Sequence, residues 1–301
     1  MCALPAWQYI SPSSISSPGH FIRHLSHILS RRRGVNYEKL THPHTSPPRF
    51  LPSLTTQLPN LTSLTLYSLT LGGPSPHGSQ KDDALQLINT PGLRELHVID
   101  VFTSAGFWTQ SSPQALKVVE FAYKYRREEE GLFEFLDIDG IVEFVGRLRE
   151  VVGLTVCLSL DGEEGTGRID AVRGEKARRF AEAVEKVGME LVVLDGTMFE
   201  LQLDEVDAFL KADLKLKVLA ISISLDGGWE KTLARLSETE TGIQELEVVG
   251  VDYNGEFVGL EKEWVGAFEG KWSELRSVKV SVLKSGSEHW VKQNGTWTKK
   301  M

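Results

Sequence analysis

The sequence predicts an α/β fold, built as an open solenoid in which parallel strands alternate with helices. Two observations lead to this prediction. A leucine pattern, L-x-x-L-x-L-x-x-L, is complete at residues 61–69 and returns in looser form seven more times. Most stretches between successive copies have the apolar spacing of an amphipathic helix.

Each copy of the pattern predicts one strand. Leu64 and Leu66 alternate with polar residues, as a strand with one buried face requires. The copies start at residues 61, 93, 116, 151, 189, 216, 243 and 275. The intervals are irregular, and a divergent family of repeats is the simplest source of eight such matches.

The connecting stretches predict helices. Residues 132–150 have helical spacing with a break at Asp139-Gly140, and residues 170–187 form an amphipathic pattern that ends at Gly188. Residues 204–212, with Asp204 as N-cap, and residues 229–237 follow the same plan. Strands that alternate with helices in this way are expected to be parallel.

The second face of the strands distinguishes two architectures. A closed (β/α)8-type barrel is the alternative to the open solenoid, and it buries both faces of every strand. The face opposite the leucines carries Ser63, Thr65 and Tyr67 in the first strand and Glu245 and Glu247 in the seventh. Polar and charged side chains there favour an open sheet with a concave face in water.

The strands and helices of residues 50–285 resemble the leucine-rich-repeat region of fungal F-box-like proteins. That resemblance implies a substrate-recognition arc joined to an F-box, the helix that binds the adaptor of a cullin ubiquitin ligase. The F-box pattern is not found before the repeats, where Leu4-Pro5-Ala6-Trp7 is its only fragment. We therefore expect a protein-binding module that meets a ubiquitin-ligase adaptor only if an F-box is supplied elsewhere.

The candidate binding residues lie on the predicted concave face. They are Tyr67, His97, Glu120, Leu191, Val193, Val218, Ala220, Glu245, Glu247 and Lys279. The apolar members around the fifth and sixth strands form either a partner site or a surface covered by the protein's own segments. The partner is expected to be another protein, and its identity is outside what these residues specify.

The competing function is an α/β-barrel enzyme that uses carboxylates at strand ends. Asp161, Asp195 and Asp226 each precede a glycine after an apolar run, where an aspartate can serve as acid, base or cation ligand. Asp-Gly is also a favourable exit turn, and that structural interpretation is preferred. No nucleotide-binding loop or metal-ligand pattern occurs, so neither a cofactor nor a metal nor catalysis is expected.

Charge divides the chain into two parts. Residues 1–60 carry a net charge of +5, and the other 241 residues carry −13. An acidic body disfavours nucleic acid as a partner, and no apolar run approaches the roughly 18–20 residues that span a bilayer. Residues 1–49 are basic and rich in serine and proline, so partial disorder and a cytoplasmic or nuclear protein are expected, with a mitochondrial presequence as the alternative.

The end of the chain predicts a hairpin. Asn294-Gly295 provides a two-residue turn between alternating segments, within residues 286–301. Trp290 and Trp297 are expected to face each other across it. Such a hairpin would cap the last open strand of the array.

Overall fold

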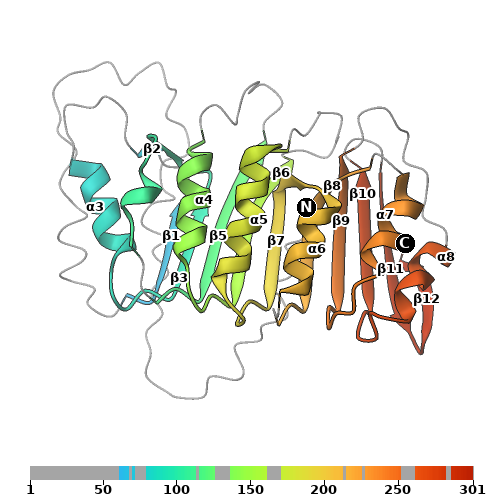
Figure 1. The fold of residues 1–301 in the computed structure, drawn as a ribbon. Coiled ribbons are helices and arrows are strands. Elements are labelled where there is room, and N and C mark those ends of the chain that lie inside the picture. Colours follow the sequence, from blue (N-terminus) through green and yellow to red (C-terminus); the bar gives the residue numbers. More distant parts are fainter. Residues whose placement is uncertain are drawn as a thin grey trace.

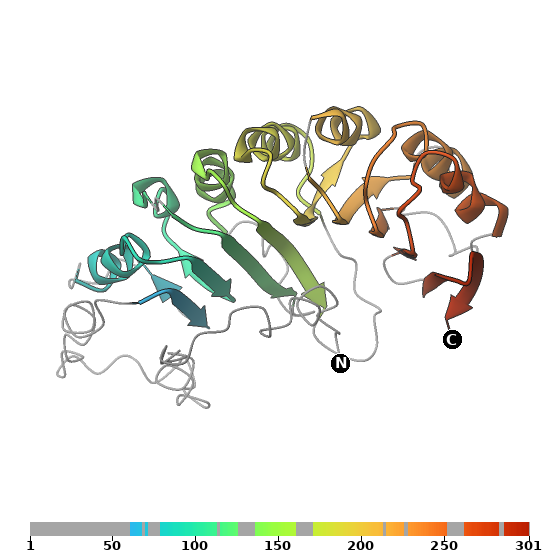
Figure 2. The ribbon, with the colours of Figure 1, turned by 90° about the horizontal axis from the view of Figure 1, so that it is seen from below.

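The computed structural model describes residues 61–67, 70–71, 79–112, 115–125, 136–160, 171–212, 215–225, 228–251, 262–282 and 286–300. A curved sheet forms one layer, and the described helices form a second layer on one of its faces (Figure 1). Figure 2 shows the sheet bent into an arc with the helices along its outer side. The inner sheet face, which none of these helices covers, is called the concave face below.

Within the described residues, the main sheet has ten strands whose order in space follows their order in the chain. The first eight are parallel. They are β1 (Ser63–Tyr67), β3 (Glu95–Ile99), β5 (Val118–Tyr125), β6 (Gly153–Leu160), β7 (Val193–Leu201), β8 (Val218–Ser224), β9 (Glu245–Val251) and β10 (Ser277–Val282). Two antiparallel strands follow, β11 (Gly286–Gln293) and β12 (Thr296–Lys300). A separate parallel pair joins β2 (Thr70–Leu71) to β4 (Phe102–Thr103).

The sheet is open. β1 and β12 stand at opposite ends of the strand order, and Figure 2 shows them far apart. The closed (β/α)8-type barrel is therefore wrong. The physical reason is visible in the strands, because a barrel would have to bury the charged side chains that the concave face carries.

The strands form where apolar and polar residues alternate. In β1, Leu64 and Leu66 are buried while Ser63 and Thr65 are half-buried and Tyr67 is exposed. The same alternation runs through β9, where Leu246 and Val248 are buried. One face of each of these strands therefore packs in the core, and the opposite face belongs to the concave face.

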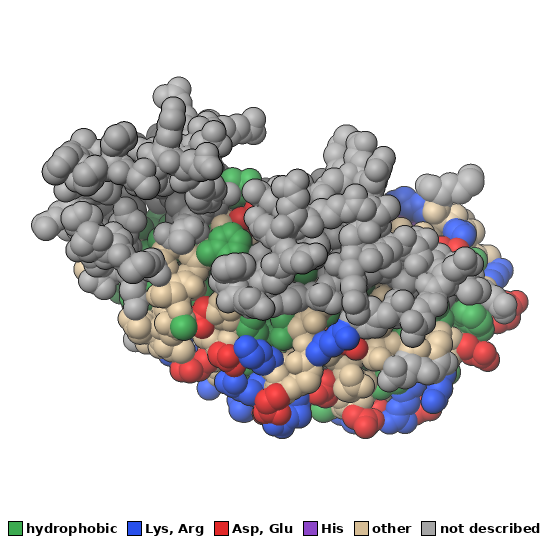
Figure 3. Space-filling model, turned by 90° about the horizontal axis from the view of Figure 1, so that it is seen from above, with side chains coloured by type: hydrophobic (Ala, Val, Ile, Leu, Met, Phe, Trp, Pro, Cys, Tyr) green, Lys and Arg blue, Asp and Glu red, His purple; other side chains and the backbone are tan. Residues whose placement is uncertain are grey.

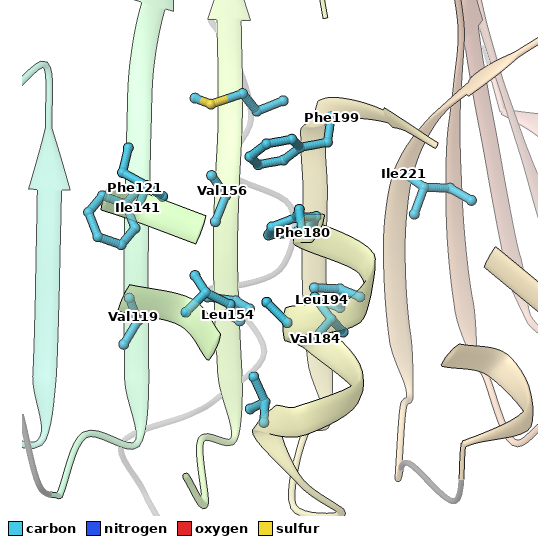
Figure 4. Packing of buried hydrophobic residues seen from close by; sticks show 14 of the residues in the cluster. Val119, Phe121, Ile141, Leu154, Val156, Phe180, Val184, Leu194, Phe199 and Ile221 are labelled. Carbon is cyan, nitrogen blue, oxygen red and sulfur yellow. The ribbon is translucent and has the colours of Figure 1, made fainter. Parts of the chain in front are cut away.

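The core lies between the sheet and the helices. Figure 4 shows side chains of β5, β6 and β7 pointing toward α4 (Ile138–Arg147) and α5 (Glu175–Val187). The rings of Phe180 and Phe199 stack with centroids 4.1 Å apart. Trp108, in the 3-10 helix η4 (Trp108–Gln110), meets Phe121 and Phe144 edge to face.

The other described helices continue this layer along the arc. They are α3 (Ser79–Ile88), α6 (Leu203–Lys211), α7 (Gly228–Leu236), α8 (Lys262–Gly266) and the 3-10 helix η6 (Ala267–Glu269). α7 buries Trp229, Leu233 and Leu236, which share one helical face.

Two local expectations for the helices were wrong. Asp139-Gly140 does not break a helix, because both residues lie in the first turn of α4, where the Asp137 side chain accepts a hydrogen bond from the Gly140 amide. The N-cap of α6 is Gln202, which forms a capping box with Glu205, and Asp204 falls inside the helix. The side-chain hydrogen bonds between Gln202 and Glu205 thus place the N-cap of α6 two residues before Asp204.

The fifth copy of the leucine pattern was placed two residues early. Met189 is 59% exposed, whereas Leu191 is 0% exposed and belongs to the core. Leu191 therefore takes the place that Leu61 has in the first copy, and it is not on the concave face. The prediction for Leu191 was wrong because Met189, Leu191 and Val193 are apolar at every second position. The leucine pattern can therefore begin at Met189 or at Leu191.

The C-terminal hairpin extends the sheet. β11 pairs with β10 and β12 with β11, and Asn294 and Gly295 both have positive φ at the turn between them. Trp290 pairs with Lys299 and Trp297 with Lys292, so the two tryptophans are diagonal neighbours and do not face each other directly. Trp297 is 5% exposed and packs in the core. The capping role of the hairpin stays a prediction.

Residues 1–49, for which a basic segment was predicted, lie outside the described residues. Within the described part of the chain, no helix combines the length and the apolar character that a membrane crossing requires.

Candidate interaction surface on the concave face

The concave face is organised in rows. Residues that pair in register on neighbouring strands point to the same side of a sheet, so equivalent positions form lines across it. The middle row consists of Thr65, His97, Glu120, Thr155, Asp195, Ala220, Glu247, Lys279 and His289. The first row, two residues earlier on the parallel strands, consists of Ser63, Glu95, Val118, Gly153, Val193, Val218, Glu245, Ser277 and Val291.

Near each end of the middle row, a glutamate contacts a basic residue on the adjacent strand. Nδ1 of His97 lies 2.6 Å from Oε2 of Glu120, and Glu120 is only 7% exposed. Toward the other end, Nζ of Lys279 donates to Oε1 of Glu247 at 2.6 Å. Two carboxylates of this row therefore have a basic side chain on the adjacent strand.

His289 extends the middle row onto the hairpin. Its Nε2 lies 2.9 Å from Oγ of Ser277. Burial lowers the pKa of His289 below its usual range, and the positive charges of Lys300 and Lys279 lower it further. Both effects disfavour the protonated, charged form of this imidazole.

Asp195 occupies the middle of the row. Its Oδ1 accepts hydrogen bonds from Oγ1 of Thr197 at 2.8 Å and from the Thr197 amide at 3.1 Å. Burial raises the pKa of Asp195 to about 6; the hydrogen bonds from Thr197 lower it, and the charges of Glu247 and Glu120 raise it. Unlike Glu247, which pairs with Lys279, Asp195 forms no ion pair with a described residue.

The position of Asp195 differs from the expected exit turn. β7 continues past it to Leu201, and the register with β8 shifts between Asp195 and Glu200. Val172 bridges to Phe199 there, and Oγ of Ser222 donates to the Thr197 carbonyl at 2.7 Å. Because these bonds engage the backbone of Thr197 and Phe199, the chain does not turn after Asp195, and Asp195 is a strand residue. Asp161 and Asp226 lie outside the described residues.

Short and apolar side chains surround Asp195. Its neighbours in the middle row are Thr155 and Ala220, and the first row beside it contains Gly153, Val193 and Val218. Val193 is 7% and Ala220 8% exposed, although neither belongs to the core cluster. The long charged side chains of the row stand farther out on both sides.

The helix side has a different electrostatic character. Figure 3 shows basic and acidic side chains mixed along the rim that the helices form. Arg178 pairs with Glu175 and Glu182, while Lys176 and Arg179 both pair with Asp139. Exposed pairs of this kind contribute little to stability and leave no local excess of either charge.

The structure places nine of the ten predicted binding residues on the concave face, Leu191 being the exception. Tyr67 is 40% exposed at the end of β1. His97, Glu120, Ala220, Glu247 and Lys279 are in the middle row, and Val193, Val218 and Glu245 are in the first row. Their role in binding stays a prediction.

Sequence reasoning missed Thr155 and His289 as members of the face. Thr155 lies between Leu154 and Val156, and aligning the copies of the leucine pattern would have identified it. His289 is brought in only by the pairing of β11 with β10, for which the pattern holds no signal.

The arrangement suits recognition of another molecule by charge and shape. Among the described residues, no group of three or more His, Cys, Asp and Glu side chains could hold a metal ion. Neither a known protein-family model nor a curated protein matches the sequence. The concave face must therefore be interpreted from its own chemistry.

Proposed function

We propose that this protein is a protein–protein interaction module, a leucine-rich-repeat-like arc whose concave face binds another protein. One observation carries the proposal: two in-register rows of polar and apolar side chains lie on a sheet face that no described helix covers. The protein would act by binding and not by catalysis.

The physical support is that no described helix packs on the concave face. Parallel sheets usually have both faces covered, because burial on both sides stabilises them. Here Leu219 and Val248 join the core from one side only, while Ala220 and Glu247 point the other way. Extended sheets that leave an inner face open are a common binding surface of solenoid proteins.

The resemblance to the repeat region of fungal F-box proteins refines the proposal. In such proteins the arc selects a substrate and the F-box connects it to the ligase. This chain would supply the recognition part, as a scaffold or a substrate receptor. A ubiquitin-ligase adaptor would be a partner only through an F-box supplied by another chain.

The test uses two exposed apolar side chains that differ in position. Tyr67 and Met189 are 40% and 59% exposed, but only Tyr67 is on the concave face. Partners are isolated with the intact chain, purified, and titrated against Tyr67→Ala and Met189→Ala. Tyr67→Ala is expected to weaken binding about tenfold, since truncating an aromatic contact at an interface typically costs 1–2 kcal/mol.

Met189→Ala is the matched control and should change the dissociation constant by less than about twofold. Val218→Asp, which places a new carboxylate in the first row, should weaken binding by at least the same factor as Tyr67→Ala. Melting curves of all variants exclude unfolding as the cause. A partner whose affinity responds to Met189→Ala but to neither concave variant would contradict the proposed surface.

A further inference from the structure

The centre of the concave face is buried, although no described helix covers it. Thr155 on β6 is 5% exposed and Val193 on β7 is 7% exposed. Val193 and the half-buried Val118 of β5 stand on either side of Gly153 in the first row. The other neighbour of Val118 is the long Glu95, yet Val193 is the more buried of the two valines. Neighbours within the sheet therefore do not explain this burial, and another part of the molecule has to lie over the centre.

The burial is confined to the middle strands. Toward β1 and β3, Tyr67 and Glu95 are exposed. Toward β9 and β10, Glu245, Glu247 and Lys279 are half-buried. The covering part of the molecule thus lies over β5 to β8 and leaves both ends of the face more open to water.

The longer connections outside the described residues do not fit this pattern. Each contains more acidic than basic residues; they are residues 126–135 after β5, 161–170 after β6 and 252–261 after β9. Ala122 and Cys157 lie nearer than Thr155 to the strand ends where the first two connections begin, and both are less buried than Thr155. The carboxylates of the middle row would also repel acidic connections. The cover therefore has to come from another part of the chain.

Residues 1–60 have the composition that the centre of the face would bind. They carry a net charge of +5 and include three consecutive arginines, residues 31–33. They also contain apolar residues such as Phe21, Leu25 and Leu29. The centre of the face combines apolar side chains with carboxylates of the middle row, so the two are complementary in charge and in polarity.

Residues 1–60 also reach the centre of the face. They precede Leu61, which stands two residues before β1. β1 and β7 are four places apart in the sheet, or roughly 19 Å at about 4.8 Å per strand. About six extended residues span this distance, so most of residues 1–60 can contact the face.

We propose that residues 1–60 pack on the centre of the concave face, so that a partner protein has to displace them. Their apolar residues contact Val193 and Ala220, and their arginines approach the surrounding carboxylates. The inference rests on the proposed function, to which it adds regulation by the chain's own segment. A tethered segment has an effective concentration of about 1 mM, so a self-contact with a dissociation constant of about 0.1 mM weakens partner binding about tenfold.

Thiol labelling tests the self-contact without a partner. In the intact chain with Cys2→Ser and Cys157→Ser, one cysteine is introduced per protein. Thr155→Cys and Ala220→Cys place it at the buried centre, and Ser281→Cys places it at the half-buried β10 end. The rate of reaction with a small thiol reagent measures the access of solvent to each position. Melting curves show whether each protein is folded, and either central position suffices for the test.

Each cysteine protein is compared with two charge-reversed forms. The first form reverses residues 31–33 through Arg31→Glu, Arg32→Glu and Arg33→Glu. The matched control reverses three exposed lysines of the outer helices through Lys186→Glu, Lys231→Glu and Lys262→Glu.

Reversal of residues 31–33 should accelerate labelling of Thr155→Cys and Ala220→Cys at least about fivefold, because the carboxylates of the face then repel the segment. Labelling of Ser281→Cys should change by less than about twofold, as should all three rates in the helix-side control. Once a partner is isolated, the same arginine reversal in the otherwise wild-type chain should tighten its binding at least about fivefold, since the competing self-contact is weakened.

Four results would overturn the inference. Labelling at the centre could be as fast as that of Ser281→Cys, could respond equally to both reversals, or could respond to neither. The fourth is a partner whose affinity is unchanged by the arginine reversal. If that partner still depends on Tyr67, the proposed function stays intact while this inference is removed, because the two experiments test different contacts.

Discussion

Replacing Asp195 by asparagine should stabilise the protein at neutral pH. The substitution removes the charge, and its side-chain oxygen can still accept the hydrogen bonds from Thr197. The pKa of Asp195 is about 6 in the folded protein against an ordinary 3.8. At about 1.4 kcal/mol per pKa unit, the ionised carboxylate lowers the free energy of unfolding by at most about 3 kcal/mol.

Partial exposure reduces this figure, since solvent screens a half-buried charge, and roughly 1–3 kcal/mol is the expected range. The sign follows from proton binding. Between pH 3.8 and about 6 the folded protein holds the Asp195 proton more tightly than the unfolded chain does, so wild-type stability falls as the pH rises through that window. The asparagine variant lacks this decline.

The assay is urea unfolding of both proteins at several pH values. The free energy of unfolding of Asp195→Asn, minus that of wild type, should increase by roughly 1–3 kcal/mol between about pH 4 and about pH 7.5. Glu185→Gln, which neutralises an exposed carboxylate of α5 on the helix side, serves as control and should stay within about 0.5 kcal/mol of wild type at each pH. A difference that is constant with pH, or that decreases as pH rises, would refute the reasoning.

Two further changes test the packing that positions the concave face. Gly196→Ala would place a Cβ 2.9 Å from Cε1 of Phe180 and should lower the free energy of unfolding by roughly 1–3 kcal/mol. In a chain that also carries Phe180→Leu, Gly196→Ala should lower the free energy of unfolding by less than it does in wild type. Urea unfolding of wild type, the two single variants and the double variant measures this difference, and strictly additive effects would contradict the prediction. Trp297→Ala should cost roughly 3–5 kcal/mol because the ring is 5% exposed and belongs to the core. The exposed Thr298→Ala is its control, and equal melting temperatures for the two variants would show that the hairpin contributes little to stability.

The strands and most helices could be predicted because their signals are local. Alternation of leucines with polar residues places Leu64 and Leu66 on one face whatever the neighbouring strands are. Helix starts were less certain, because Gln202 and Asp137 cap through side-chain bonds that compete with other nearby candidates.

Local signals failed where two frames or two structures were both acceptable. Met189 and Leu191 fit the leucine pattern equally well, and only burial against the helices distinguished them. Asp195-Gly196 has the preference of a turn, but pairing of β7 with Val172 and Ser222 keeps it in a strand. Tertiary hydrogen bonds outweighed the turn preference at that point.

The sequence by itself determined that each strand has one leucine-rich face and one polar face, because side-chain direction alternates along any strand. It also favoured an open sheet over a closed barrel through residues such as Glu245 and Glu247. Only the tertiary structure decided which charges meet. His97 and Glu120 are 23 residues apart and Glu247 and Lys279 are 32 apart, and strand register brings each pair together while leaving Asp195 without a basic partner among the described residues. Register is set by contacts across the whole sheet, and no single copy of the pattern contains it.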